Sequence, residues 1–91
     1  MKISKEIESC FSEMESLLKQ SFLNEFMRCE AGALSRYHFG FGLWIRSHFL
    51  TEENDVCLLF SQDGAVSKDD MSMRVIRLFH AYLQTKYLNH D

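Results

Sequence analysis

The fold is decided by residues 37–49, which read Tyr37-His38-Phe39-Gly40-Phe41-Gly42-Leu43-Trp44-Ile45-Arg46-Ser47-His48-Phe49. This stretch holds the only Trp of the chain and two of its four Gly. Apolar residues recur at steps of three and four, which is the spacing of one helix face. These residues are Leu34, Tyr37, Phe41, Trp44 or Ile45, and His48. Other apolar side chains fall on a second face, so segment 33–50 is predicted to be a central helix surrounded by others.

Gly40 and Gly42 interrupt this pattern. Each costs about 1 kcal/mol relative to Ala in the interior of a helix. Three interpretations stay open: another backbone approaches closely, the helix bends or breaks, or the two glycines belong to a ligand site.

Composition favours a single all-α domain over residues 1–91. The chain has 91 residues, 46% of them hydrophobic, which is enough for one modest core. It contains no Pro and only four Gly, so strong breakers of helices are few. Several helices joined by short links are therefore expected rather than a many-stranded sheet.

Apolar spacing and capping residues predict about five helices, near residues 4–19, 21–29, 33–50, 53–61 and 68–87. The last has the clearest start, because Ser67 can cap it and Asp69 and Asp70 suit the positive end of the helix dipole. A first helix that continues through residue 21 is the main alternative to two separate helices.

Negative charge is concentrated in the second half of the chain, whose overall net charge is −3. Between residues 51 and 70 lie six acidic residues and one lysine, a local net charge of −5. The six are Glu52, Glu53, Asp55, Asp63, Asp69 and Asp70. They predict an acidic patch, with solvated loops and helix starts as the alternative. No basic surface for direct binding of nucleic acid is expected.

The chain is predicted to be cytoplasmic. The N-terminal residues MKISKEIES lack the apolar core of a signal peptide, and no apolar run is long enough to cross a membrane. The three cysteines have no metal-binding spacing, so reduced and mostly buried thiols are expected.

No catalytic or metal-binding signature is found among the polar residues. The four His residues form no HxxxH or HExxH pair, so we expect no metal and no cofactor. Adjacent acids at a helix start point in different directions, and capping explains them better than catalysis. We therefore expect a protein that is not an enzyme. A small enzyme or metal site would be centred on His38, Trp44, Arg46 and Asp70.

Four motifs in order resemble a family of small bacterial proteins. They are residues 38–46 (HFGFGLWIR), Leu59-Phe60 with Gly64, Asp69-Asp70-Met71-Ser72, and residues 79–83 (FHAYL). The family pattern is close to HFGLGxWIRNxW followed by HPDDMS, and the resemblance covers about residues 35–85. This chain has Ser67-Lys68 where the pattern favours His-Pro. The motif residues expected to be structural are His38, Gly40, Gly42, Trp44, Arg46, Met71 and Ser72.

Members of such families resemble immunity proteins encoded beside bacterial toxins, including toxins of contact-dependent growth inhibition. The resemblance implies a protein that binds a cognate toxin, expected to be a nuclease, and blocks its active site. The six acidic residues between 51 and 70 are then the expected partner-binding residues. Whether the chain is a monomer or a homodimer stays open. The alternative function is a regulatory or adaptor module that binds a host protein through a helical groove.

Overall fold

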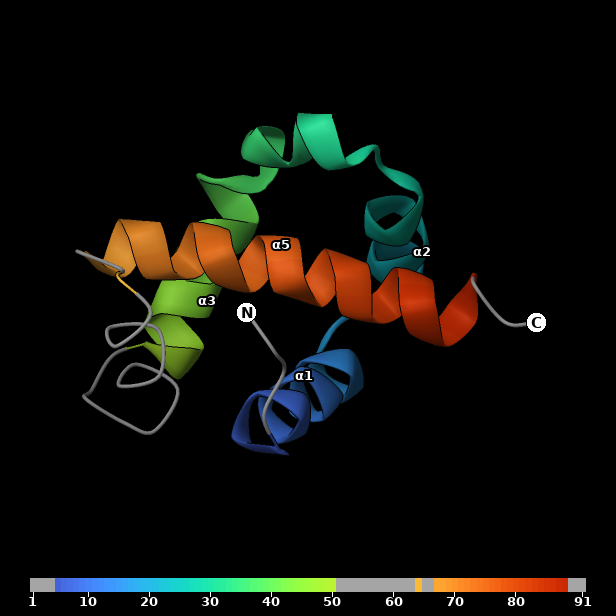
Figure 1. Cartoon of the computed structure of the whole chain (residues 1–91), viewed down its shortest axis with the longest axis horizontal. Helices are drawn as coiled ribbons and strands as arrows, with labels where there is room; N and C mark the ends of the chain where they lie inside the picture. Colours follow the sequence, from blue (N-terminus) through green and yellow to red (C-terminus); the bar gives the residue numbers. More distant parts are fainter. Residues whose placement is uncertain (1–4, 51–63, 65–66, 89–91) are drawn as a thin grey trace.

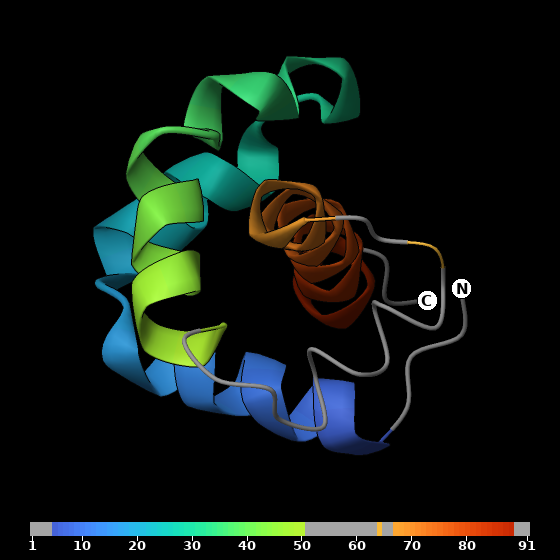
Figure 2. The same cartoon turned by 90° about the vertical axis from the view of Figure 1, so that its left-hand side faces the viewer.

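The longest helix, α5 (Lys68–Tyr87), occupies the centre of the structure. The computed structural model describes residues 5–50, 64 and 67–88. Figure 2 shows α5 nearly end-on, with α1, α3 and the 3₁₀ helix η1 arranged around it. The predicted cap is confirmed, because the Ser67 hydroxyl accepts a hydrogen bond from the backbone N–H of Asp70 at 3.1 Å. The buried residues of α5 are Ser72, Val75, Ile76, Phe79, His80 and Leu83.

Two separate helices form the N-terminal part of the described chain. Helix α1 (Lys5–Leu17) buries Ile7, Cys10, Phe11 and Met14. Helix α2 (Gln20–Arg28) buries Leu23, Phe26 and Met27. Lys19 between them has an extended backbone with ψ of 142°, so the two helices are not continuous. The sequence prediction of two helices is therefore correct, with a first helix that ends at Leu17.

The predicted continuous helix over residues 33–50 is wrong. Its sequence forms a 3₁₀ helix, η1 (Ala31–Tyr37), and an α-helix, α3 (Gly40–Phe49). At the junction the His38 N–H bonds to the Ser35 carbonyl, an i to i+3 contact that tightens the turn. Gly40 follows and begins α3. The break lets both pieces pack on α5, so α5 contacts η1, α2 and α3 and takes the central role predicted for 33–50.

Aromatic rings fill the core between these helices. Phe26 of α2 is fully buried and contacts rings from three other elements. Ring centroids lie 5.0 Å away at Tyr37, 5.3 Å at Phe41 and 5.8 Å at Phe79. Helix α1 joins the same cluster, because Phe11 lies 5.3 Å from Phe79. The all-α fold predicted from the sequence is confirmed, and the single-core packing follows from these contacts.

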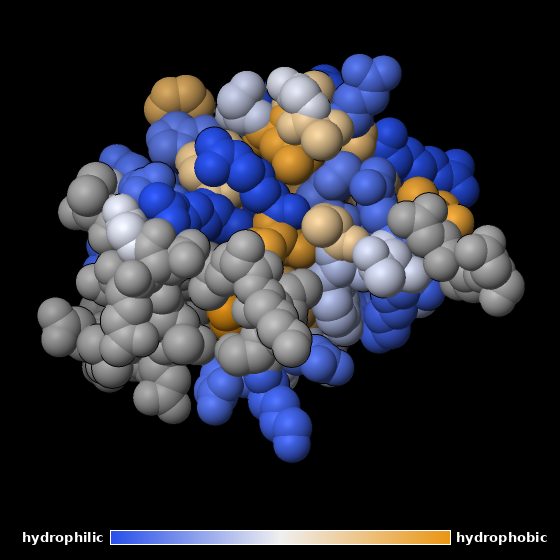
Figure 3. All heavy atoms as spheres, viewed as in Figure 1, coloured by the Kyte–Doolittle hydropathy of each residue, from blue (hydrophilic) through white to orange (hydrophobic). Residues whose placement is uncertain are grey.

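The surface mixes charged and apolar residues. In the space-filling view of Figure 3, hydrophobic groups gather near the top, over the stretch where η1 runs. Smaller hydrophobic areas lie among hydrophilic groups elsewhere on the part of this face that is coloured by hydropathy. None of the described helices combines the length and apolar character that crossing a bilayer requires. The helix predicted near 53–61 lies outside the described residues.

We expect Phe26→Ala to lower the free energy of unfolding by about 3 to 5 kcal/mol, because it leaves a cavity among five neighbouring rings, those of Tyr37, Phe41, Phe79, Phe22 and His80. Phe26→Leu keeps most of the volume and should lower it by about 1 to 2 kcal/mol. Urea unfolding followed by circular dichroism measures both. Phe39→Ala is the control, because Phe39 is 82% exposed and should leave stability unchanged. Equal effects of Phe26→Ala and Phe39→Ala would contradict the placement of the core.

Candidate functional site

Three of the motif residues, Gly42, Arg46 and Ser72, meet where α3 crosses the first half of α5. Gly40, Gly42, Trp44 and Arg46 belong to α3, and Met71 and Ser72 belong to α5 together with Asp69 and Asp70. His38 lies in the turn between η1 and α3. Glu52, Glu53, Asp55 and Asp63 lie outside the described residues, so their predicted role in a partner interface stays a prediction.

Arg46 links the two helices of this crossing. Its Nη1 donates a hydrogen bond to the Ser72 hydroxyl at 3.0 Å and lies 3.4 Å from the Asp69 carboxylate. The Ser72 hydroxyl in turn donates to the Asp69 carbonyl oxygen at 2.9 Å. Ser72 is fully buried, so its hydroxyl needs both contacts to avoid an unsatisfied polar group. The crossing is therefore a closed polar network in a mainly apolar interface.

Gly42 makes room for this network. A Cβ atom at position 42 would lie 3.1 Å from Arg46 Nη1 and 3.7 Å from the Ser72 hydroxyl. At Gly40 a Cβ would meet nothing within 4 Å. Of the interpretations left open by the sequence, close packing therefore fits Gly42, although its nearest neighbour is a side chain and the nearest backbone atom, Tyr37 O, would lie 3.6 Å away. Gly40 marks the break where α3 begins.

The acidic start of α5 is paired with arginines. Asp69 contacts Arg46 as described, and the Asp70 carboxylate lies 3.5 Å from Arg74 Nη2, one helical turn later. The side chain of Asp69 is nevertheless 68% exposed, compared with 33% for Asp70. These two carboxylates therefore carry less unbalanced charge than composition alone implies, and Asp69 is the one that faces water.

The residues proposed from sequence as an enzyme or metal site engage separate partners. Trp44 stacks on His48 with a ring distance of 4.7 Å, and His38 packs edge-on against Phe39 at 5.1 Å. In residues 5–50, 64 and 67–88 no group of three His, Cys, Asp or Glu side chains is placed to hold a metal ion. Burial, with a smaller effect of nearby Glu13, raises the pKa of the Cys10 thiol to about 11, so this thiol stays protonated at neutral pH.

Side chains of α5 also satisfy the carbonyl groups at the end of α2. His80 is 3% exposed, and its Nε2 donates to the Cys29 carbonyl oxygen at 2.7 Å. Gln84 Nε2 donates to the Met27 carbonyl oxygen at 3.1 Å. The last carbonyls of a helix have no partners within the helix itself. His80 is thus explained as a buried structural residue.

A second polar cluster joins α1 to the C-terminal half of α5. Glu15 Oε2 accepts hydrogen bonds from the Tyr82 hydroxyl at 2.8 Å and from Lys86 Nζ at 3.1 Å. Glu15 Oε1 accepts from the Tyr87 hydroxyl at 2.6 Å. Sequence analysis missed this cluster, because the position of Glu15 in the first helix marks it only as a polar residue. The one sequence signal of this polar cluster is the spacing of Tyr82 and Lys86, which are four residues apart and therefore lie on one helix face.

The cluster holds Glu15 in its charged form. Burial raises the pKa of Glu15, but hydrogen bonds from Tyr87, Tyr82 and Lys86 outweigh burial and leave this pKa below its ordinary value. The bond to Glu15 raises the pKa of Lys86 above its ordinary value. The Lys86 side chain is 47% exposed and that of Glu15 only 13%, so solvent screens much of the attraction on the lysine side.

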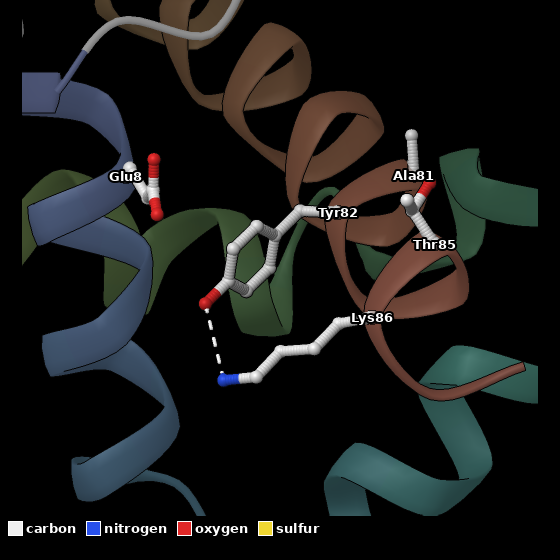
Figure 4. A pocket seen from close by; sticks show the side chains of 5 residues that line it. All are labelled: Glu8, Ala81, Tyr82, Thr85 and Lys86. Atoms are coloured by element: carbon white, nitrogen blue, oxygen red, sulfur yellow. Dashed lines mark hydrogen bonds between the residues drawn. The ribbon is translucent and has the colours of Figure 1, made fainter. Parts of the chain in front are cut away.

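A hollow of about 490 Å³ lies beside this cluster, between α1 and α5. Figure 4 shows Tyr82 and Lys86 reaching from α5 toward α1, where Glu8 lies on the facing helix; Ala81 and Thr85 complete the lining. Lys86 already bonds to Glu15 and contacts the Tyr82 hydroxyl at 3.4 Å. Two of the lining residues, Ala81 and Tyr82, belong to the fourth motif at residues 79–83. The charged group of Lys86 serves to fasten α5 to α1 through Glu15.

The chain belongs to the family defined as a domain of unknown function, DUF6794, whose model matches residues 3–83. No curated protein and no solved structure matches the chain. The matched range includes every described helix except the last residues of α5.

We expect Gly42→Ala to give a free energy of unfolding about 1 kcal/mol lower than Gly40→Ala does. The Cβ at position 42 crowds Arg46 and weakens its bond to Ser72, whereas position 40 accepts a methyl group freely. Urea unfolding measures both variants. In an Arg46→Gln background the difference should shrink, because the crowded guanidinium is gone. Equal stabilities of the two Ala variants in the wild-type background would contradict this account.

We expect Glu15→Gln to lower the free energy of unfolding at pH 7 by about 1 kcal/mol, a value reduced for partial exposure. Because the folded-state pKa of Glu15 lies below its unfolded value, its contribution is complete above about pH 4.5 and is lost as pH falls through the lower folded pKa. The difference between wild type and Glu15→Gln should therefore vanish in acid. The control is Glu13→Gln, because Glu13 is exposed. If the stability difference between wild type and Glu15→Gln does not change with pH, the lowered pKa of Glu15 is not the source of its contribution.

Proposed function

We propose that this chain is an immunity protein that binds a cognate toxin, a nuclease, and covers its active site in the cytoplasm. The observation that supports it best is the Asp69 carboxylate, which is 68% exposed and directed by Arg46 at the start of α5. The family resemblance noted from residues 38–46 and 69–72 supplies the biological class. The argument from the molecule itself is electrostatic.

A nuclease binds the phosphates of its substrate with basic side chains, so its groove attracts carboxylates. Residues 51–70 of this chain carry a net charge of −5. Pairing of Asp69 with Arg46 and of Asp70 with Arg74 reduces the contribution of α5. By sequence, most of the unbalanced negative charge therefore falls on Glu52, Glu53, Asp55 and Asp63.

A carboxylate that is already fixed loses little conformational freedom when it binds a partner. Asp69 meets this condition, because both its carboxylate and its carbonyl oxygen are engaged at the α3–α5 crossing. One carboxylate oxygen lies near Arg46, and the exposed remainder of the group is accessible to a guanidinium or ammonium group of a partner.

Co-purification of this chain with the product of the neighbouring toxin gene, followed by a nuclease assay, tests the proposal. We expect a stoichiometric complex in which cleavage of nucleic acid is silenced. The triple variant Glu52→Lys, Glu53→Lys and Asp55→Lys should weaken the complex about 100-fold or more, because like charges then face the basic groove. A complex with no effect on cleavage, or no complex with a non-toxic neighbour, would favour the adaptor alternative.

Exposed Glu6, Glu13 and Glu25 provide a control triple with the same change in net charge. Their reversal to Lys should weaken binding much less, since long-range attraction alone is affected. Affinity should be measured at low and at high salt, because the interface triple also removes salt dependence. Unchanged affinity and unchanged salt dependence in the interface triple would remove the acidic-groove model.

A further inference from the structure

Two large apolar side chains of the motif region are exposed. Phe39 is 82% exposed and Leu43 is 57% exposed, although each stands within a segment whose neighbours form the core. Phe41 and Ile45 of the same segment are 6% and 0% exposed. Burial of a Phe or Leu side chain favours folding, so leaving both in water forgoes that favourable contribution.

The two side chains form a stripe that ends at the polar network of the crossing. Phe39, Leu43 and Arg46 follow one another at steps of four and three, which places them along one side of α3. Arg46 ends the stripe and holds the Asp69 carboxylate at 3.4 Å. The side chain of Arg46 is 20% exposed and that of Asp69 is 68% exposed, so a partner would meet chiefly the carboxylate.

We propose that the stripe of Phe39 and Leu43, with Asp69 at its end, is the surface that anchors the toxin. The partner then carries an apolar hollow beside a basic side chain, the arrangement expected at the edge of a nuclease groove. This inference rests on the proposed function and deepens it, because it names the described residues that make the contact. A few aromatic and aliphatic anchors supply most of the affinity in such interfaces.

Charge complementarity selects this occupant. The chain has a net charge of −3, and Asp69, whose carboxylate is exposed, follows Asp63 by six positions in the acidic stretch 51–70. Arg36, exposed in the last turn of η1, is the basic side chain that precedes Phe39 by three residues. A basic partner surface is attracted by Asp69 and repelled by Arg36, so the two residues report the sign of the partner's charge independently.

The local packing limits the motion of the stripe before binding. The His38 ring packs edge-on against Phe39 at 5.1 Å and restricts the rotamers of the exposed ring. Leu43 lies between Gly42 and Arg46 on α3, and the 3.0 Å hydrogen bond from Arg46 to Ser72 holds this part of α3 against α5. Both anchors therefore lose little conformational entropy when the toxin covers them.

The test uses the full chain and a catalytically inactivated form of the neighbouring toxin, with affinity measured by calorimetry. We expect Phe39→Ala and Leu43→Ala each to raise Kd about 30-fold, the range of interface hot spots. Leu17→Ala is the matched control, because Leu17 on α1 is 58% exposed, almost the same as Leu43. All three variants should keep the wild-type unfolding curve, which separates loss of contact from loss of fold.

Charge variants test the identity of the occupant. Asp69→Asn should raise Kd several-fold with a weaker dependence on salt, and Arg36→Gln should leave Kd unchanged or lower it. If Arg36→Gln weakens the complex and Asp69→Asn tightens it, the partner surface is acidic and the proposed occupant is wrong. Analytical sedimentation of the chain alone tests whether a second copy of the chain occupies the stripe. If the chain forms a dimer that the variant Phe39→Asp dissociates, a second copy covers the stripe and the proposal is wrong.

The outcomes separate this inference from the proposed function. If the toxin binds and is silenced but Phe39→Ala and Leu43→Ala bind as well as Leu17→Ala does, the anchor surface is wrong and the immunity function stands. If the wild-type chain does not bind the toxin, the proposed function and the occupant named here both fall. If Phe39→Ala and Leu43→Ala lose binding and Leu17→Ala does not, the result supports both the immunity function and the anchor surface.

Discussion

The structure depends on covering one helix along its whole length. Helix α5 has buried side chains from Ser72 to Leu83, and no single short helix can shield a face that long. The chain solves this with different helices along it, α3 near the start and α1 and α2 near the end. Polar contacts fix both places, through Arg46 and Ser72 at one and through Glu15 and Lys86 at the other. Between them the aromatic core closes around Phe26 and Phe79.

Much of this arrangement follows from local patterns in the sequence. The cap at Ser67 and the helices α1 and α5 were predicted from spacing and capping rules, because those features depend on neighbours a few residues away. The break near His38 was not, since the periodicity of Leu34, Tyr37 and Phe41 is shared by a continuous helix and by two shorter pieces that turn at Gly40. Contacts of η1 and α3 with α5 favour the two shorter helices over one continuous helix.

The candidate site was predicted in part. The resemblance named Arg46 and Ser72 only as structural residues, and the sequence did not predict that they bond to each other. The crowding that a side chain at position 42 would cause accounts for a glycine inside α3. The partners of the acidic residues could not be predicted, because Asp69 meets an arginine 23 positions earlier in the chain. Glu15 shows the same limit more strongly: its three donors are 67 to 72 residues away, and its periodicity marks it only as polar.

The carbonyl groups at the end of α2 tie the order of folding to the last helix. They receive donors from His80 and Gln84, which lie 51 and 57 residues further along the chain. A helix of nine residues is marginal by itself, so α2 gains its C-terminal turn only after α5 has docked. The amide protons of α2 and of the second half of α5 should then exchange with solvent as one cooperative unit.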